Sequence, residues 1–370
     1  MGEISIYIHI PFCKSKCLYC DFLSYGGREA YIEPYINALI DEIRAFKCEK
    51  NVKSIYIGGG TPSIIDQKYI QNIMGELYAC FKIKDDAEIT IEANPGTVDF
   101  EKLSVYRKAG INRISFGLQS CNNDLLKKIG RIHTFEEFEH SFESARKAGF
   151  ENINCDIMFS LPGQTPEGYF DTIKRVTDLK PEHISAYSLI IEEGTPFYDM
   201  YNNGQFKMPD EDADRYMYHR GTDLLEEKGY FRYEISNYAK SGRQCQHNIV
   251  YWRRDEYKGF GLGAASLVDE VRLKNTESFS DYIQGNYVCE KEQLTLIDEQ
   301  EEFMFLGLRC IEGVSEKDFL KCFGVTIDSV YGKQIEKMVK QGLMEHCDGR
   351  IFLTEKGLDL ANMVFVEFMQ

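Results

Sequence analysis

The sequence has no long hydrophobic run, and this limits the classes of protein that it can encode. No apolar stretch approaches the roughly 18 residues that suggest a transmembrane helix. The first residues, MGEIS, lack the basic and apolar segments of a secretory signal peptide. We therefore predict a cytoplasmic protein without a transmembrane anchor, in which cysteine thiols stay reduced.

Positive charge is also scarce. The chain has 43 Lys and Arg against 59 Asp and Glu, a formal net charge of −16. Electrostatic binding of nucleic acid or of an anionic membrane needs a basic surface, so this balance argues against a nucleic-acid partner. With 43% hydrophobic and 28% charged residues, the composition is otherwise that of a globular protein with a full core.

Short β-branched runs alternate with amphipathic stretches between residues 4 and 191. The predicted strands are 5–10, 52–58, 87–93, 112–118, 152–159 and 183–191. No G-x-G-x-x-G turn follows the first of them, which argues against a dinucleotide-binding sheet. Polar or glycine residues instead follow the ends of several strands, where (β/α) barrels carry their chemistry: Cys13, Gly59–Thr61, Glu92, Gln119 and Asp156. We predict an α/β protein built on a partial, TIM-like (β/α)6 barrel.

The barrel is expected to occupy residues 1–235, followed by a less regular connecting region, 236–293. Residues 294–370 read as three helices, two short strands and a last helix, an order that resembles a winged helix. This smaller α+β domain has more acidic than basic residues over 315–370, which is unfavourable for DNA binding. A packing or lid role is therefore expected for it.

Three of the twelve cysteines, Cys13, Cys17 and Cys20, form a C-x3-C-x2-C run behind the first predicted strand. Structural zinc sites usually pair two C-x2-C knuckles, and the chain has no second one. A zinc ion completed by His9 or Asp21 is the alternative. A cubane iron–sulfur cluster fits the spacing better, and three ligands would leave one of its irons open.

This run, with Tyr19 before its last cysteine, resembles the radical S-adenosylmethionine (SAM) superfamily. The resemblance implies a [4Fe–4S] cluster on the three cysteines, SAM on the open iron and, on reduction, release of a 5′-deoxyadenosyl radical. It also implies that Tyr7 and Tyr19 flank the cofactor. The "GGGTPS" stretch at 58–63 is similar to the loop that brings backbone close to the methionine amino group, an approach that glycine permits because it lacks a Cβ. Gly59, Gly60 and Thr61 are the positions implied.

Four further polar residues resemble the cofactor site of the oxygen-independent coproporphyrinogen III oxidase family. Taken singly, they could be helix caps or partners in surface ion pairs. Together the resemblance implies that carboxylates and an amide bind ribose hydroxyls, and that a guanidinium pairs with the methionine carboxylate. The residues implied in the cofactor site are Glu92, Gln119, Arg131 and Asp156, with Ile190 and Leu267 as apolar contacts.

The family has two branches, and the sequence is similar to only one of them throughout. The oxidases resemble C-x3-C-x2-C-x-C and carry an N-terminal extension, whereas this chain has Phe22 at the fourth cysteine position and begins close to its first strand. The heme chaperone branch has "CDF" and an H-N-x-x-Y-W motif, which "HNIVYW" at 247–252 matches at every fixed position. The alternative is an oxidase that decarboxylates porphyrin propionates, so whether the protein is an enzyme stays open at this point.

The resemblance implies that the chain binds the cluster, SAM and heme, and that it transfers heme to an unidentified acceptor protein. A homodimer is compatible with this expectation. An imidazole or a thiolate can ligate heme iron, which makes His247 and Cys245 the candidate ligands. Tyr251 and Trp252 offer flat rings suited to a porphyrin face. The alternative for His247 is a hydrogen-bonded structural role.

Overall fold

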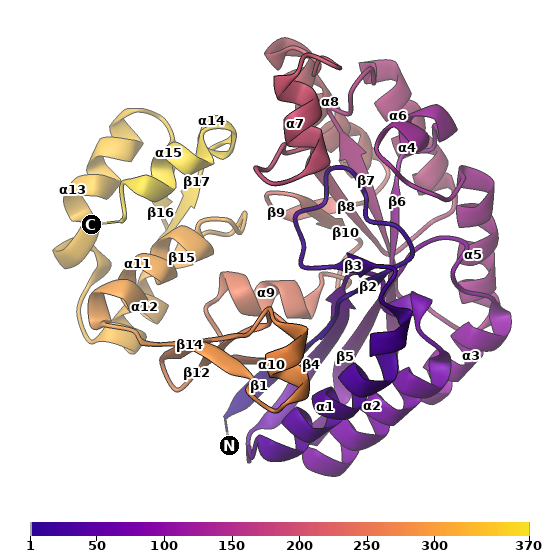
Figure 1. Cartoon of the computed structure of the whole chain (residues 1–370). Helices are drawn as coiled ribbons and strands as arrows, with labels where there is room; N and C mark the ends of the chain where they lie inside the picture. Colours follow the sequence, from indigo (N-terminus) through magenta and orange to yellow (C-terminus); the bar gives the residue numbers. More distant parts are fainter. Residues whose placement is uncertain (1, 370) are drawn as a thin grey trace.

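The computed structural model describes residues 2–369, and its largest feature is a twelve-stranded sheet (Figure 1). The six strands predicted from the sequence are all present as parallel neighbours at the centre of this sheet. In sheet order they are β1 (Glu3–Ile10), β4 (Asn51–Gly59), β5 (Lys82–Ala93), β6 (Arg113–Gln119), β7 (Ile153–Phe159) and β8 (His183–Ser188). The predicted barrel-type α/β architecture is therefore confirmed.

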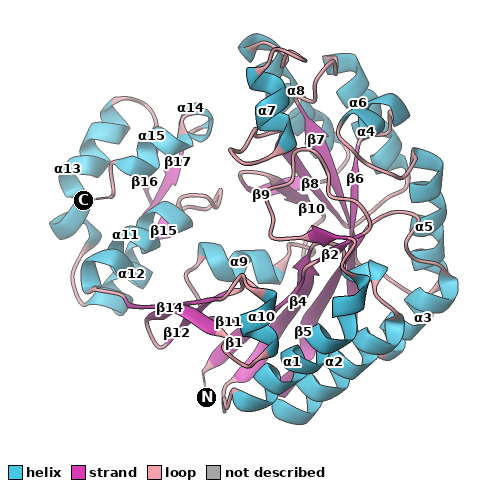
Figure 2. Ribbon diagram, in the orientation of Figure 1, coloured by secondary structure: helices cyan, strands magenta, loops and turns pink. Residues whose placement is uncertain are grey.

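Helices cover the outer face of these strands, as Figure 2 shows. They are α1 (Ile32–Ala45), α2 (Gln67–Cys80), α3 (Phe100–Lys108), α4 (Asn123–Lys128), α5 (Phe135–Lys147) and α6 (Pro166–Asp178). The residues at the ends of each helix determine where it begins and ends. In α5, for example, Thr134 and Glu137 form a capping box, and Gly149, with φ +89°, follows the last turn.

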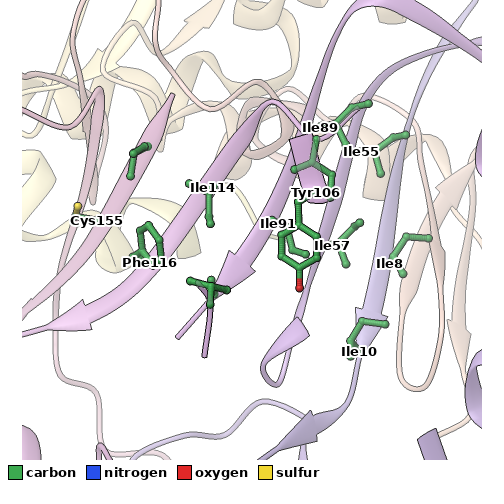
Figure 3. Packing of buried hydrophobic residues seen from close by; sticks show 14 of the residues in the cluster. Ile8, Ile10, Ile55, Ile57, Ile89, Ile91, Tyr106, Ile114, Phe116 and Cys155 are labelled. Atoms are coloured by element: carbon green, nitrogen blue, oxygen red, sulfur yellow. The ribbon is translucent and has the colours of Figure 1, made fainter. Parts of the chain in front are cut away.

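The two faces of the central strands differ in polarity because side chains alternate along each strand. Isoleucines such as Ile8, Ile57 and Ile91 point outward into the apolar layer beneath the helices (Figure 3). The alternate positions carry polar groups that bond to one another across the inner face, such as Ser5 to Ser54. The outward side chains thus form the hydrophobic core, and the inward polar side chains are available to form a binding site.

The sheet continues beyond the six strands on both sides. On the β8 side it adds β10 (Asn237–Ala239) and β9 (Phe231–Glu234); beyond β1 it adds β11 (Tyr257–Phe260), β12 (Ala265–Val268), β13 (Val271–Asn275) and β14 (Val288–Gln293). Residues 236–293, expected from the sequence to be a connection, thus supply five strands of the sheet. Over the described residues 2–369 the strand order runs from β14 to β9 without closing.

Six further strands and α-helices complete the barrel part of the chain. They are β2 (Phe12–Cys13), β3 (Tyr25–Gly26), α7 (Pro196–Asn202), α8 (Glu211–Glu227), α9 (Gln246–Trp252) and α10 (Phe279–Ile283). Within residues 2–369 we find no helix with the length and apolar character needed to cross a membrane.

The C-terminal domain has its own core and the predicted winged-helix order. Its elements are α11 (Leu296–Gly307), β15 (Val314–Ser315), α12 (Glu316–Phe323), α13 (Ile327–Lys340), β16 (Met344–Cys347), β17 (Arg350–Leu353), α14 (Glu355–Asp359) and α15 (Ala361–Val366). Several contacts join it to the barrel, among them an ion pair and a backbone hydrogen bond. Arg215 of α8 forms an ion pair with Asp359 at 3.0 Å, and the Ile311 amide donates to the Tyr233 carbonyl oxygen of β9 at 3.0 Å.

Candidate functional site

The cysteine run begins with Cys13 at the end of β2 and continues through the loop between β2 and β3, beyond the carboxyl end of β1. Two backbone hydrogen bonds and one side-chain contact hold this loop in place. The Leu18 amide donates to the Ile129 carbonyl oxygen at 3.1 Å, and the Phe197 amide donates to the Leu18 carbonyl oxygen at 2.9 Å. His9 Nε2 lies 2.8 Å from the Leu23 carbonyl oxygen. The loop has no regular secondary structure, and contacts with Ile129, Phe197 and His9 hold it in place.

The three cysteines line one cavity together with most of the other predicted cofactor residues. Besides Cys13, Cys17 and Cys20, the predicted residues that line it are Tyr19, Gly59, Gly60, Thr61, Glu92, Gln119, Arg131 and Asp156. None of the three thiols is in a disulfide. Burial raises the pKa of Cys20 to about 11, so a thiolate there requires a compensating cation. Three free thiols beside a polar cavity fit an iron–sulfur cluster with one open iron.

Gly60 allows the second loop to approach the cysteines. Its amide donates to the Ile10 carbonyl oxygen at 2.9 Å. A Cβ at this position would lie 2.8 Å from the Phe12 carbonyl oxygen and 3.0 Å from Cys13 Sγ. Only glycine therefore fits here without moving the first cysteine.

Arg131 connects the cysteine loop to the floor of the cavity. Its Nη1 donates to Cys17 Sγ at 3.4 Å and its Nη2 donates to Asn94 Oδ1 at 2.7 Å. Nη2 also contacts the Gly117 carbonyl oxygen, whereas the buried Nε meets no acceptor within residues 2–369. A guanidinium in this position can attract both the cluster sulfurs and a ligand carboxylate.

Glu92 is held at the bottom of the cavity with its charge suppressed. The Tyr56 hydroxyl donates to Oε1 at 2.8 Å and the Gly59 amide donates to Oε2 at 3.1 Å. Burial, reinforced by the nearby Asp156 carboxylate, raises the pKa of Glu92 to about 7. This carboxyl can therefore exchange a proton near neutral pH, and a cationic ligand would favour its ionised form.

Asp156 and Gln119 form the opposite wall. Asn154 Nδ2 donates to Asp156 Oδ1 at 2.7 Å, and burial raises the pKa of the Asp156 carboxyl. Gln119 follows a bulge in β6 and has φ +73°, a left-handed conformation that is unusual outside glycine. The Tyr187 hydroxyl donates to Gln119 Oε1 at 3.1 Å. The strained backbone turns this amide into the cavity instead of along the strand.

Three predicted contacts lie outside the cavity lining. Tyr7 lies behind Glu92, with its hydroxyl 2.9 Å from His9 Nδ1 and its ring stacked on Tyr56. Leu267 is buried opposite Tyr257, near the amino end of β1, whereas the cavity is at the carboxyl end. Ile190 is 66% exposed and lines a neighbouring cleft.

The two predicted heme ligands are buried in the interior of the barrel. His247 is 1% exposed, with Nδ1 2.9 Å from Ser54 Oγ and Nε2 3.0 Å from the Tyr251 hydroxyl. The Cys245 thiol donates to Glu88 Oε1 at 3.5 Å. Both imidazole nitrogens thus have partners, and this conformation leaves no open position for heme iron at either residue.

Several residues that line the cavity were not identified from the sequence, and among them are Asn94 and Tyr187. Asn94 lies two residues after Glu92, and its Nδ2 donates to Thr61 Oγ1 at 3.0 Å. Tyr187 occupies an inward position of β8. The sequence could have identified Tyr187 as an inward-facing residue. Side chains alternate between the two faces of a strand, and Tyr187 lies two residues after Ser185, on the same face.

Comparisons with known proteins agree with this geometry. The Radical SAM superfamily model matches residues 7–176, and the HemN C-terminal domain model matches residues 294–360. A solved structure, coproporphyrinogen III oxidase (HemN) from Escherichia coli, shares the fold with a TM-score of 0.86 at 24% identity, covering 99% of this chain and 90% of that one.

Curated relatives match over the whole length. The chain is 38% identical to the heme chaperone HemW of Bacillus subtilis, over 99% of both chains. It is 35% identical to the heme chaperone HemW of Escherichia coli K12, over 100% of this chain and 99% of that one. Such similarity implies a [4Fe–4S] cluster and SAM as cofactors. The chain therefore belongs to the radical SAM superfamily and, within its coproporphyrinogen III oxidase-like family, to the branch of the heme chaperone HemW.

Proposed function

We propose that the protein is a heme chaperone that binds a [4Fe–4S] cluster, SAM and heme, and passes heme to an acceptor protein. The observation that carries this proposal is the full-length similarity to chains named heme chaperone HemW. Two local features support it: the H-N-x-x-Y-W motif at 247–252, and Phe22 in place of a fourth cysteine.

Under this proposal the cavity residues bind and orient the cofactors. Cys13, Cys17 and Cys20 would hold the cluster, which in this family supplies one-electron chemistry to bound SAM. Arg131 would pair with the methionine carboxylate while it remains bonded to Cys17. Glu92 and Asp156, both with raised pKa values, would gain charge as the cationic sulfonium enters.

Oxidative decarboxylation of coproporphyrinogen III is the competing function, because the same cofactor cavity would serve it. One anaerobic preparation can separate the two. After reconstitution, the chaperone proposal predicts about four irons and about four sulfides per chain. It also predicts a Soret band that saturates at one equivalent of heme. After an apo-acceptor is added and the two proteins are separated, the band should be found with the acceptor.

The decisive measurement is porphyrin turnover on the same sample. With reductant, SAM and coproporphyrinogen III, the wild type should form no more protoporphyrinogen than a Cys17→Ala variant. Turnover well above that variant would overturn the chaperone proposal in favour of the oxidase. A reconstituted protein that never binds heme would also overturn it.

A further inference from the structure

A second cavity adjoins the cofactor cavity and lies between the barrel and the C-terminal domain. It encloses about 430 Å³, within the range of about 300–1,000 Å³ typical of small-molecule sites. One wall comes from the carboxyl end of β8 and the segment after it, and the other from α14 and α15. Figure 1 shows α14 and α15 on the side of the C-terminal domain that faces α7 and α8. We call this cavity the interdomain cleft.

Apolar side chains on both walls of the interdomain cleft are exposed without a partner. Ile190 on the barrel wall is 66% exposed. Met363 and Leu360 on the opposite wall are 62% and 37% exposed. Exposed apolar groups that face one another across a cleft favour a flat apolar ligand between them.

The cleft also contains a cation that is available for an anionic group. The Arg309 guanidinium stacks on the Trp252 ring, 4.4 Å from its centroid, and its Nε is buried without an acceptor in the described chain. Glu234 is the nearby carboxyl: its Oε1 accepts from the Ser236 amide and from Asn237, and its buried Oε2 accepts no hydrogen bond within residues 2–369. Burial raises the pKa of Glu234, and the Arg309 charge opposes that rise without a direct ion pair. A stacked, preorganised guanidinium is well suited to bind a carboxylate.

The other arginine of the cleft is already neutralised. Arg215 donates to Asp359 at 3.0 Å, and it also bonds to Asp214 at 2.5 Å. It therefore fixes α14 against α8 and leaves Arg309 as the anion-binding group. This arrangement also gives the H-N-x-x-Y-W motif a role at the cleft, because Trp252, its last residue, positions Arg309.

One side chain belongs to both cavities. Tyr187 lines the cofactor cavity and the interdomain cleft, and its hydroxyl donates to Gln119. A ligand in the cleft would therefore be able to contact a side chain that also lines the cofactor cavity.

We propose that the interdomain cleft is the heme site, with the macrocycle between Ile190 and the Leu360–Met363 wall and a propionate carboxylate on Arg309. An apolar disc with two carboxylates matches apolar walls beside a guanidinium whose Nε meets no acceptor within residues 2–369. The inference rests on the proposed heme-chaperone function and gives that function a location distinct from His247.

The test is heme titration, followed at the Soret band, of anaerobic full-length protein carrying its cluster. Ile190→Glu and Met363→Glu place a charge against the macrocycle at exposed positions, so the fold is preserved. Each should weaken heme binding at least about tenfold, because an unpaired charge would be desolvated. Arg309→Gln should weaken it by a similar factor, and Arg309→Lys should recover part of the loss.

Two matched variants provide controls. Val339→Glu, at an apolar position of α13 that is 40% exposed, should change heme affinity less than about twofold. Lys321→Gln lies in a different cavity, beside Trp252 and Phe303, and should also leave heme affinity unchanged. Folding of every variant is checked by circular dichroism and SAM binding.

The outcomes separate the two proposals. A wild type that binds no heme contradicts the proposed function itself. A wild type that binds one heme, with affinity unaltered in Ile190→Glu, Met363→Glu and Arg309→Gln, leaves the function standing and overturns the cleft. Loss of affinity in Lys321→Gln alone would move the site to the other cavity and equally overturn the inference.

Discussion

The imidazole ring of His247 stacks on the phenol ring of Tyr56, with ring centroids 5.3 Å apart and planes inclined by 30°. The Tyr56 hydroxyl donates to Glu92 in the cofactor cavity. Helix α9, which carries the H-N-x-x-Y-W motif, is thus coupled to the cofactor site through one side chain. We interpret His247 as a residue that positions Tyr56, because both of its nitrogens are used inside the barrel.

Replacing His247 should therefore affect stability. His247→Ala leaves Ser54 and Tyr251 without their buried partner, and we expect a loss of about 1–3 kcal/mol in the free energy of unfolding. Urea denaturation of cluster-free protein measures it. His140→Ala, at an exposed position of α5, is the control and should change stability by less than about 0.5 kcal/mol. Equal stability of the two variants would contradict the positioning role.

The stabilising effect of His247 should depend on pH. Burial, aided by the charges of Arg113 and Lys53, lowers the pKa of His247 from 6.5 to about 3. Above pH 6.5 both folded and unfolded states hold a neutral imidazole; below it the unfolded state binds a proton that the folded state does not. The stability difference between wild type and His247→Gln should therefore shrink by about 1.4 kcal/mol per pH unit on acidification below pH 6.5. A difference that stays constant would show that the folded-state pKa is not lowered.

Gly60 and Gly75 make a matched pair of alanine substitutions. Gly60→Ala places a methyl group against the Phe12 carbonyl and Cys13 Sγ, so we expect loss of cluster iron and destabilisation by about 1–3 kcal/mol. Gly75 lies in α2 with open space around it, so Gly75→Ala should raise stability by up to about 1 kcal/mol. Iron content and urea denaturation check both variants. Full iron content in Gly60→Ala would refute the steric argument.

The affinity for SAM should rise with pH through neutrality. Glu92 has a pKa raised to about 7, so its carboxyl is protonated below that pH and charged above it. The charged form attracts the sulfonium cation. Calorimetric titration should show weaker binding at about pH 6 than at about pH 8, whereas Glu92→Gln should bind about tenfold less tightly at high pH and lose the dependence. A pH profile that persists in Glu92→Gln would assign the effect to another group.

Arg131 should raise the reduction potential of the cluster. Its Nη1 donates to Cys17 Sγ, and hydrogen bonds to cluster sulfurs favour the reduced, more negative state. Arg131→Gln should lower the potential measured by redox titration, and Arg131→Lys should lower it less because the charge remains. An unchanged potential in Arg131→Gln would exclude this contact in the loaded protein.

Much of the architecture could be predicted from local sequence. The six central strands are long β-branched runs, and β4 (Asn51–Gly59) lies within a residue or two of its predicted limits. The cysteine spacing and the "GGGTPS" loop are likewise short-range patterns, and the structure brings them to one cavity. Strands and short motifs of this kind can be predicted from one sequence because each depends on residues that are close together in the chain.

The remaining features depend on contacts between distant segments. Strands β11 to β14 have only four to six residues each, and their place in the sheet follows from pairing such as Tyr257 with Ser5. The burial of His247 depends on Ser54, far away in the chain. The stacking of Arg309 on Trp252 joins two domains. A single sequence contains no local pattern for such pairings, so the interdomain cleft was not predicted.

The unclosed sheet has a consequence for biosynthesis. Strand β14 is protected by its own charges, including Glu290 and Lys291, but β9 is covered only when the Ile311 amide reaches the Tyr233 carbonyl. Because a nascent polypeptide leaves the ribosome amino end first, the β9 edge stays uncovered until the final segment is made. Uncovered edges recruit other strands. The C-terminal domain, which supplies the Ile311 amide, therefore protects the β9 edge against the addition of a foreign strand.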